Sequence, residues 1–330
     1  MTMAATCCAA RVYQGAARYW STRIGAVLSI GTPGDDSNDR PDRGSLELAA
    51  EATVLRMLLG AQLRRLREAA DISAEKAGYE IRASRSKISR IETGRVGLKI
   101  RDIEDLLTLY SVTDSRERSQ ILDLARQSST PDWWTKYGDL LPGWFESYLG
   151  LESAADTIRS FQVQFIPGLF QTEDYARAVT RLGHQTAPPE EIERRVTLRL
   201  QRQELLTRPA PPRVWMIMDE AVLRRPHGGA DVMRGQLRHL LDTARLPHVT
   251  LQVVPFAHGG HAAASGSFSI LRFAERDLPD IVYIEQLTSA VYLDQRPDVE
   301  HYLEVVHQLS GEAMTPAATT RFIEQVAGET

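Results

Sequence analysis

Residues 72–92 read ISAEKAGYEIRASRSKISRIE, and this stretch decides the fold of the N-terminal part of the chain. Ser73 and Ser84 each precede a run of residues that is compatible with a helix. A serine hydroxyl can accept a hydrogen bond from the backbone N–H groups that the start of a helix leaves unpaired. Two such caps eleven residues apart leave room for one short helix and a tight turn, so the stretch predicts a helix-turn-helix.

The second of these helices has one apolar and one polar face. Ile88 and Ile91 are three residues apart, so both side chains can pack inward on the same side of a helix. The side chains that then point away are cationic or hydrogen-bonding, namely Arg85, Ser86, Lys87 and Arg90. A helix that enters the major groove of DNA requires such a face.

Positive charge is concentrated around this helix. Residues 84–101 hold six basic residues and one acid, a net charge of +5, whereas the whole chain has a net charge of −4. The other residues therefore sum to −9, and the positive charge lies where a phosphate backbone would attract it. The alternative interpretation is an ordinary helical bundle with a solvated basic face, which the concentration of charge disfavours.

At these residues the chain resembles the Cro and phage-repressor type of helix-turn-helix, in the large XRE-like family of bacterial regulators. The resemblance rests on the apolar and basic run at 59–67, the Ile-Ser start at 72–73 and the segment 84–95. It implies an all-α, lambda-repressor-like domain. It also implies an ion pair between Arg67, late in the first helix, and Glu92, at the end of the recognition helix.

The same resemblance assigns DNA contacts to individual positions. It implies that Arg85, Ser86 and Arg90 face base edges, with Lys87 nearby. Candidates for phosphate contacts are the residues at helix starts or in the loop after the recognition helix, which are Ser73, Ser84, Thr93, Arg95 and Lys99. Double-stranded DNA is thus the first expected partner.

Two positions depart from the family pattern. Ala74 stands where the second residue of the second helix is usually glutamine, which puts one phosphate contact in doubt. Arg82 stands where the turn usually has glycine. Because an arginine in the left-handed conformation costs on the order of 1 kcal/mol, this turn is expected to be longer or differently shaped.

The composition is that of an ordinary globular protein, with 330 residues of which 43% are hydrophobic and 25% charged. No apolar run approaches the roughly 20 residues that a membrane-spanning helix needs. The only cysteines, Cys7 and Cys8, are too few to staple a secreted fold. We therefore expect a cytoplasmic protein that has no membrane partner.

The chain is expected to consist of three regions. Residues 1–50 form an extension whose second part is too polar and turn-rich to fold alone, so we expect disorder there. An organelle transit peptide is the alternative reading of its arginine-bearing start. Residues 51–127 form the helix-turn-helix domain, and residues 128–330 form a second domain that begins after a Ser-Ser-Thr-Pro boundary.

The second domain opens with a dense group of aromatic residues, which includes Trp133, Trp134, Trp144 and Tyr148. These rings either line a ligand or partner surface or form a hydrophobic joint between the two domains, and aromatics at near-helical spacing are usually core. The aromatic block is therefore kept as a candidate ligand, partner or interdomain surface.

The rest of the second domain alternates strand-like and helix-like segments. The alternation of Phe161, Val163 and Phe165 predicts a half-buried strand. Further strands are expected at 213–218, 248–255, 267–273, 281–286 and 290–293, and helices are expected after Thr172 and at 188–207, 231–246 and 298–327. The fold class is therefore multi-domain, an all-α helix-turn-helix domain followed by a mixed α/β (α+β) domain.

This segment resembles the C-terminal domain of many actinobacterial, especially streptomycete, XRE-type regulators. Separate blocks carry the resemblance in order, at 133–134, 144–152, 167–176, 219–223, 236–240, 253–256 and 266–268. The resemblance implies a transcriptional regulator that is sometimes described as antitoxin-like and is often encoded beside a small partner protein. It supplies no catalytic residues.

Catalytic and metal-binding motifs are not found in the sequence, which has no HExxH, paired CxxC, Walker loop or Rossmann glycine fingerprint. His258 and His261 lie close together in a glycine loop, but they lack the third ligand that a metal site needs. The acids Glu152, Asp219, Glu220 and Glu285 have no spacing that enforces convergence. We therefore expect no enzyme, no catalytic or metal-ligating residues and no cofactor.

The sequence as a whole predicts a DNA-binding transcriptional regulator with a C-terminal domain that senses a ligand or binds a partner protein. A homodimer is expected, because one recognition helix contacts too few bases for operator-level specificity. One alternative is an antitoxin-like protein that neutralises a small partner protein encoded nearby and uses DNA binding for autoregulation. Another is a DNA-tethered enzyme that uses an acid such as Asp219.

Overall fold

The computed structural model describes residues 43–129, 132–263, 266–275 and 278–330, all of which belong to one unit that spans Pro41–Thr330. The expected disorder of the extension falls on residues 1–42, outside the described range. The helix α2 begins at Arg43, so residues 43–50 of the expected extension are helical instead. This segment is rich in leucine, alanine and glutamate, which have high helix propensity.

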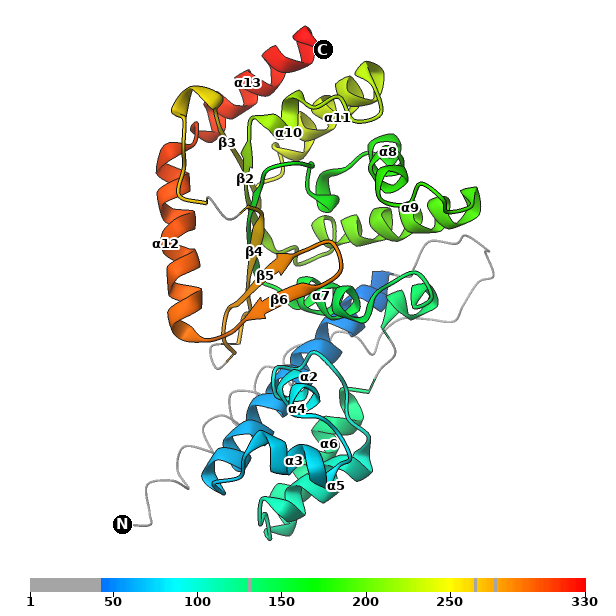
Figure 1. Cartoon of the computed structure of the whole chain (residues 1–330), viewed down its shortest axis with the longest axis vertical. Coiled ribbons are helices and arrows are strands. Elements are labelled where there is room, and N and C mark those ends of the chain that lie inside the picture. The colour runs from blue at the N-terminus through cyan, green and yellow to red at the C-terminus, as the bar shows by residue number, and fades with distance from the viewer. Residues whose placement is uncertain (1–42, 130–131, 264–265, 276–277) are drawn as a thin grey trace. The chain divides into compact units, whose positions relative to one another are not determined.

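The N-terminal part of the described chain is all helical (Figure 1). Its helices are α2 (Arg43–Ala69), α3 (Ala74–Glu80), α4 (Arg85–Glu92), α5 (Ile100–Leu109) and α6 (Ser115–Gln127). The apolar faces of these helices meet in a separate hydrophobic core, and every one of the helices contributes to it. The buried residues of this core include Leu63, Ile88, Ile103, Leu107 and Ile121. Residues from neighbouring turns of each helix fill this core because i and i+3 or i+4 side chains share a face.

The C-terminal part is built around a six-stranded mixed sheet in the order β3-β2-β1-β4-β5-β6. The strands are β1 (Thr157–Gln162), β2 (Arg213–Asp219), β3 (Val249–Val254), β4 (Phe268–Arg272), β5 (Ile281–Glu285) and β6 (Ala290–Leu293). Strands β1, β2 and β3 run parallel, whereas β4, β5 and β6 form an antiparallel meander that joins the sheet at β1. The predicted fold class is thereby confirmed.

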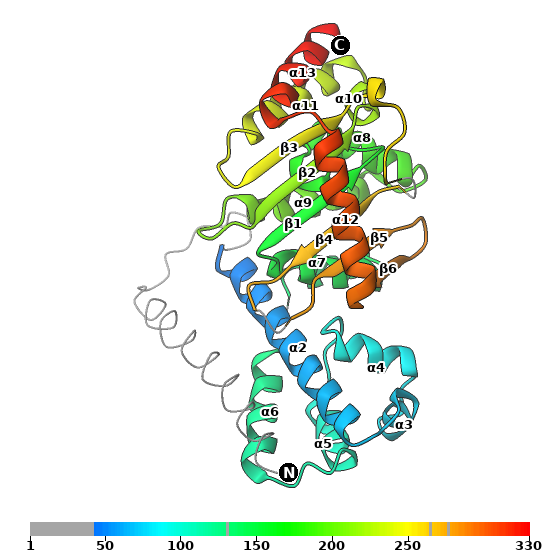
Figure 2. The same cartoon turned by 90° about the vertical axis from the view of Figure 1, so that its left-hand side faces the viewer.

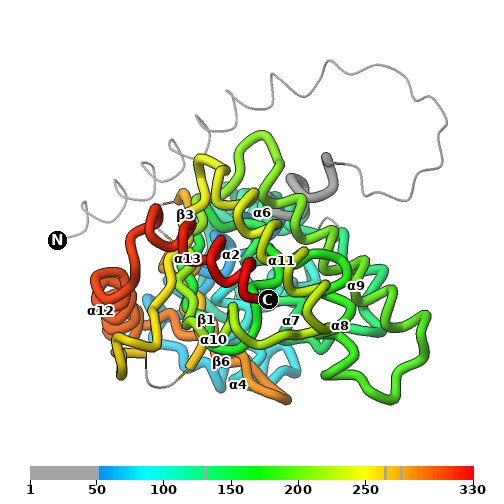
Figure 3. The backbone as a smooth tube through the Cα atoms, turned by 90° about the horizontal axis from the view of Figure 1, so that it is seen from above, coloured from blue at the N-terminus to red at the C-terminus, as the bar shows by residue number. Residues whose placement is uncertain are grey.

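Helices cover both faces of this sheet, as Figures 2 and 3 show for α12 (Arg296–Glu312) on one side and α11 (Ala230–Thr243) on the other. The face opposite α12 also carries α8 (Glu173–Gly183) and α13 (Pro316–Glu329), and α9 (Pro189–Gln203) packs against α8. Because both faces are buried, β2 and β3 read as nearly continuous apolar runs. The short helix α10 (Ala221–Arg224) follows β2, and short 3-10 turns occur at η3 (Gly168–Phe170), η4 (Glu204–Leu206) and η5 (Phe256–His258).

Two of the predicted elements were placed wrongly. The strand expected from the alternation of Phe161, Val163 and Phe165 is shifted toward the N-terminus, because its parallel partner β2 and antiparallel partner β4 both pair with residues 157–162. Beyond Gln162 the chain leaves the sheet. The single C-terminal helix is interrupted, because Thr315 caps a new helix that has Pro316 at its first position.

The helix α2 takes part in both halves of the described chain. It packs along α7 (Gly143–Ala154), and Met57 lies in the same buried cluster as Tyr148 and Leu151. Arg56 of α2 forms an ion pair of 3.1 Å with Asp132, next to η2 (Trp133–Tyr137). Among the residues that the structure describes, no helix combines the length and apolarity that crossing a membrane requires.

Candidate nucleic-acid interface

Both serine caps of the helix-turn-helix are formed. The Ser73 hydroxyl accepts a hydrogen bond of 3.1 Å from the backbone N–H of Lys76, and the Ser84 hydroxyl accepts one of 3.2 Å from Lys87. Between the helices Arg82 adopts the left-handed conformation, with φ of +54°. The turn therefore keeps the shape that a glycine would give it, and we attribute about 1 kcal/mol of local backbone cost to the arginine.

The recognition helix α4 has the two faces that its sequence predicts. Ile88 and Ile91 are buried, whereas Arg85, Ser86 and Arg90 are exposed. Lys87 is half-buried, whereas the other three side chains face solvent. These three are exposed on the side that would meet base edges if α4 enters a major groove.

Arg85 has a competing partner on the protein itself. Its guanidinium lies 3.2 Å from the carboxylate of Glu75 on α3, and the two side chains are 75% and 59% exposed. An ion pair this exposed contributes little free energy, so Arg85 can exchange Glu75 for a base at small cost. The pair orients the arginine on the outer surface of the two helices.

The candidate phosphate-contact residues differ in how accessible they are. Ser73, Ser84 and Lys99 are exposed, and Lys99 precedes α5 without capping it through its side chain. Thr93 and Arg95, in the loop after α4, are partly buried and already engaged, because the Arg95 Nε donates a hydrogen bond of 2.8 Å to the Thr93 hydroxyl oxygen. Both candidate phosphate-contact residues in this loop therefore already form contacts within the protein.

Arg67 and Glu92 lie in contact and tie the first helix of the domain to the recognition helix. The Nε and Nη2 of Arg67 donate to the two carboxylate oxygens of Glu92 over 2.6 and 3.0 Å, and Nη1 donates to the Ile72 carbonyl over 2.8 Å. The side chains are only 12% and 7% exposed. The hydrogen bonds to Glu92 are the main reason that the pKa of the Arg67 guanidinium is raised, despite its burial.

The helix α2 also approaches the end of α4 closely, beside the Arg67–Glu92 pair. This contact was not predicted from the sequence. A Cβ atom on Gly60 would lie 2.3 Å from the carbonyl oxygen of Ile91 and 2.8 Å from backbone atoms of Glu92. Only glycine fits there, so Gly60 sets the distance between the two helices. A glycine in the middle of the leucine-rich run 58–63 was the available signal.

The structure buries most of the aromatic block. Trp133 and Trp134 pack edge-to-face, with 5.6 Å between their ring centroids, in a cluster with Tyr137 and Leu198. Trp144 and Tyr148 instead join the larger core beside the sheet, where Tyr148 is buried and Trp144 is half-buried. This packing favours a hydrophobic joint over a surface that presents the rings to a ligand.

The acids that were considered for catalysis are engaged in contacts within the protein. Glu152 forms a bidentate pair with Arg202, with both N–O distances 2.9 Å, and Glu220 accepts hydrogen bonds from Arg224 and from the Phe256 N–H. His261 lies 3.9 Å from Asp219, beyond hydrogen-bond distance. Within the described residues no three potential ligands gather around a common metal position.

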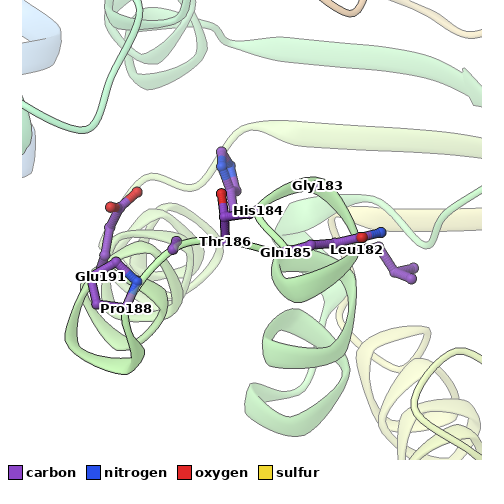
Figure 4. A pocket seen from close by; sticks show the side chains of 8 residues that line it. Leu182, Gly183, His184, Gln185, Thr186, Pro188 and Glu191 are labelled. Carbon is purple, nitrogen blue, oxygen red and sulfur yellow. The ribbon is translucent and has the colours of Figure 1, made fainter.

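An open depression of about 470 Å³ lies at the loop between α8 and α9 (Figure 4). Its lining is residues 182–188 together with Glu191, whose carboxylate is already 2.7 Å from Arg195. Burial, and then the charge of Arg195, lower the pKa of His184 in this lining. The depression lies on elements other than the helix-turn-helix.

Two models of known protein families match the chain, one in its N-terminal part and one in its C-terminal part. A family model described as a helix-turn-helix domain matches residues 58–120, which include α3 and α4. A family model described as a domain of unknown function (DUF5753) matches residues 145–325, more than half of the chain. No curated protein and no solved structure matches the chain. The chain therefore belongs to the DUF5753 family, and its helix-turn-helix domain makes it a DNA-binding regulator.

Proposed function

We propose that the protein is an XRE-type transcriptional regulator that recognises specific sites on double-stranded DNA by inserting α4 into the major groove. Arg85, Ser86 and Arg90 read base edges, with Lys87 beside them. The side chains that fix the helix on the phosphate backbone are Ser73, Ser84, Thr93, Arg95 and Lys99. The DUF5753 domain governs this binding in response to a ligand or a partner protein.

One observation carries the proposal. The exposed face of α4 bears Arg85, Ser86 and Arg90, while its other face is fixed to the domain by Ile88 and Ile91 and by the Arg67–Glu92 pair. A rigid helix with arginine on its free face can form bidentate hydrogen bonds with guanine, the commonest specific contact in the major groove. The net charge of +5 over residues 84–101 supports the approach of this face to phosphates.

The protein binds its site as a homodimer in this proposal. One short helix reads only a few base pairs, and two copies related by a twofold axis read two half-sites about one helical turn apart. Specificity at the level of a genome needs this larger footprint, because the number of competing sites is large.

Selection from a pool of random duplexes tests the proposal. Full-length protein should enrich one short motif, arranged as an inverted repeat with half-site centres about 10 base pairs apart. Enrichment of the motif as a single copy would contradict the dimer but not the base reading. Salt-dependent binding without any enriched motif would contradict sequence-specific recognition.

A further inference from the structure

Arg95, which we propose contacts a phosphate of DNA, is held by the DUF5753 domain in this structure. It follows α4 by three residues, and its Cζ atom lies 4.6 Å from the centroid of the Tyr292 ring on β6. The Arg95 carbonyl oxygen accepts a hydrogen bond of 3.2 Å from the hydroxyl of Ser147 on α7. The loop after the recognition helix is therefore fastened through both its backbone and its arginine.

The Arg95 guanidinium is partly buried and has charges of both signs nearby. Burial lowers the pKa of Arg95, the nearby carboxylate of Asp294 and the phenol group of Tyr292 oppose that shift, and the charge of Arg90 adds to it. Arginine stays protonated under all ordinary conditions, so its charge persists in this partly dry position. The π face of Tyr292 thus replaces part of the hydration that a free arginine would have, and Asp294 acts on the guanidinium through its charge.

The Tyr292 ring cannot follow Arg95 toward DNA, because the core of the C-terminal domain holds it. Its hydroxyl donates to the Trp144 carbonyl, and its ring centroid lies 5.2 Å from that of Tyr283. Tyr283 in turn stacks on Tyr148 at 4.1 Å, inside the buried cluster. If Arg95 moves toward DNA, it therefore leaves the ring behind.

We propose that Tyr292 holds Arg95 away from DNA, so that the DUF5753 domain restrains DNA binding through an autoinhibitory contact with one residue that would otherwise bind phosphate. A change that moves β6 relative to the loop after α4 releases Arg95 and adds one phosphate contact. The proposal rests on the DNA-binding function proposed above. The alternative is that Tyr292 presents Arg95 to the phosphate, and the two differ in the sign of a mutational effect.

A random-sequence duplex of about 30 base pairs is a sufficient probe, since phosphate contacts are independent of sequence. Fluorescence anisotropy gives the affinity of full-length wild-type protein and of Tyr292→Leu between about 50 and 200 mM salt. Leucine keeps apolar bulk but removes the π face. The variant should steepen the slope of log affinity against log salt by about 0.9 and bind about tenfold more tightly near 0.1 M salt.

The gain must depend on Arg95. Tyr292→Leu should therefore produce no gain when it is introduced into an Arg95→Ala background. Tyr292→Phe is the matched control, because it keeps the ring under the guanidinium and loses only the hydroxyl, so it should retain most of the restraint. Asp294→Asn removes the charge without disturbing the ring, and it should shift affinity in the same direction as Tyr292→Leu by a smaller factor. It also provides an independent test if the melting temperature shows that Tyr292→Leu is poorly folded.

Several results would overturn the inference. Weaker binding and a flatter slope for Tyr292→Leu would mean that the ring presents Arg95 to DNA. An equal gain with and without Arg95 would place the effect elsewhere. If the wild type and every variant bind the duplex without salt dependence, the proposed DNA-binding function fails and the inference fails with it. Salt-dependent binding without any difference among the variants rejects the inference alone.

Discussion

Replacing Glu92 with glutamine should weaken both the fold and the DNA affinity, because this carboxylate neutralises the largely buried guanidinium of Arg67. The substitution keeps the shape of the side chain and removes only its charge. Arg67 would retain its bond to the Ile72 carbonyl, and Glu68 would remain at 3.6 Å as the nearest carboxylate. The positive charge would otherwise be left without a partner between α2 and α4.

The size of the effect follows from the burial of the pair. Breaking a buried ion pair from one side costs about 3–5 kcal/mol. A glutamine oxygen can still accept one of the two hydrogen bonds, so we expect a loss near the lower limit, about 3 kcal/mol. Since α2 also packs into the core beside the sheet, we expect one cooperative transition of the unit Pro41–Thr330, whose midpoint should fall by about 5 °C.

Thermal unfolding followed by circular dichroism measures this loss. The matched control is Asp123→Asn on α6, which breaks an ion pair with Arg126 whose side chains are 56% and 58% exposed. That surface pair should contribute less than about 1 kcal/mol. A double-mutant cycle between Arg67→Met and Glu92→Gln should give a coupling free energy above about 1.5 kcal/mol. Additive effects of the two substitutions, or a Glu92→Gln loss as small as that of the control, would refute the reasoning.

The remaining predictions concern the helix contact, the phosphate contacts and the aromatic block. Gly60→Ala should lower the stability by about 1–3 kcal/mol, because its Cβ would overlap the Ile91 carbonyl. The control is Gly235→Ala in α11, whose Cβ meets nothing within 4 Å and which should raise the stability by about 0.5–1 kcal/mol. Thermal unfolding of both variants separates a steric cause from a general effect of alanine. Lys99→Ala should flatten the slope of log affinity against log salt by about 0.9 on random DNA, and an unchanged slope would place Lys99 off the duplex. Trp134→Ala should cost about 3–5 kcal/mol and should change the affinity for DNA with two half-sites more than for one half-site; equal changes on both, measured per folded molecule, would reduce Trp134 to core packing.

Local patterns in the sequence predict much of the fold. A helix start needs one capping side chain close by in the chain, so Ser73 and Ser84 could be read directly. The spacing of Ile88 and Ile91 identifies the buried face of α4 for the same reason. The strands at 213–219, 249–254 and 281–285 are short apolar runs bounded by polar or turn-forming residues, which is how buried strands appear.

Features that depend on distant partners could not be predicted. The alternation of Val163 and Phe165 continues after Gln162, yet the strand stops there because β2 and β4 offer no further pairing. The contact between Arg95 and Tyr292 depends on the register of the β5–β6 hairpin and on the packing of α7, neither of which leaves a mark near Arg95 in the sequence. The sequence therefore indicated Arg95 as a residue that contacts phosphate, but it did not indicate that Tyr292 contacts Arg95 in this structure.

Sequence reading by α4 is the central claim, and Arg90 tests it most directly, because the side chain is exposed in the last turn of the recognition helix. Anisotropy titrations of wild type and Arg90→Ala should be carried out on the selected duplex and on a scrambled duplex of the same composition. We predict a loss of about 1–3 kcal/mol on the selected duplex and a much smaller loss on the scrambled one. Equal losses on the two duplexes would show that Arg90 contacts only phosphate and would contradict base recognition by this face of α4.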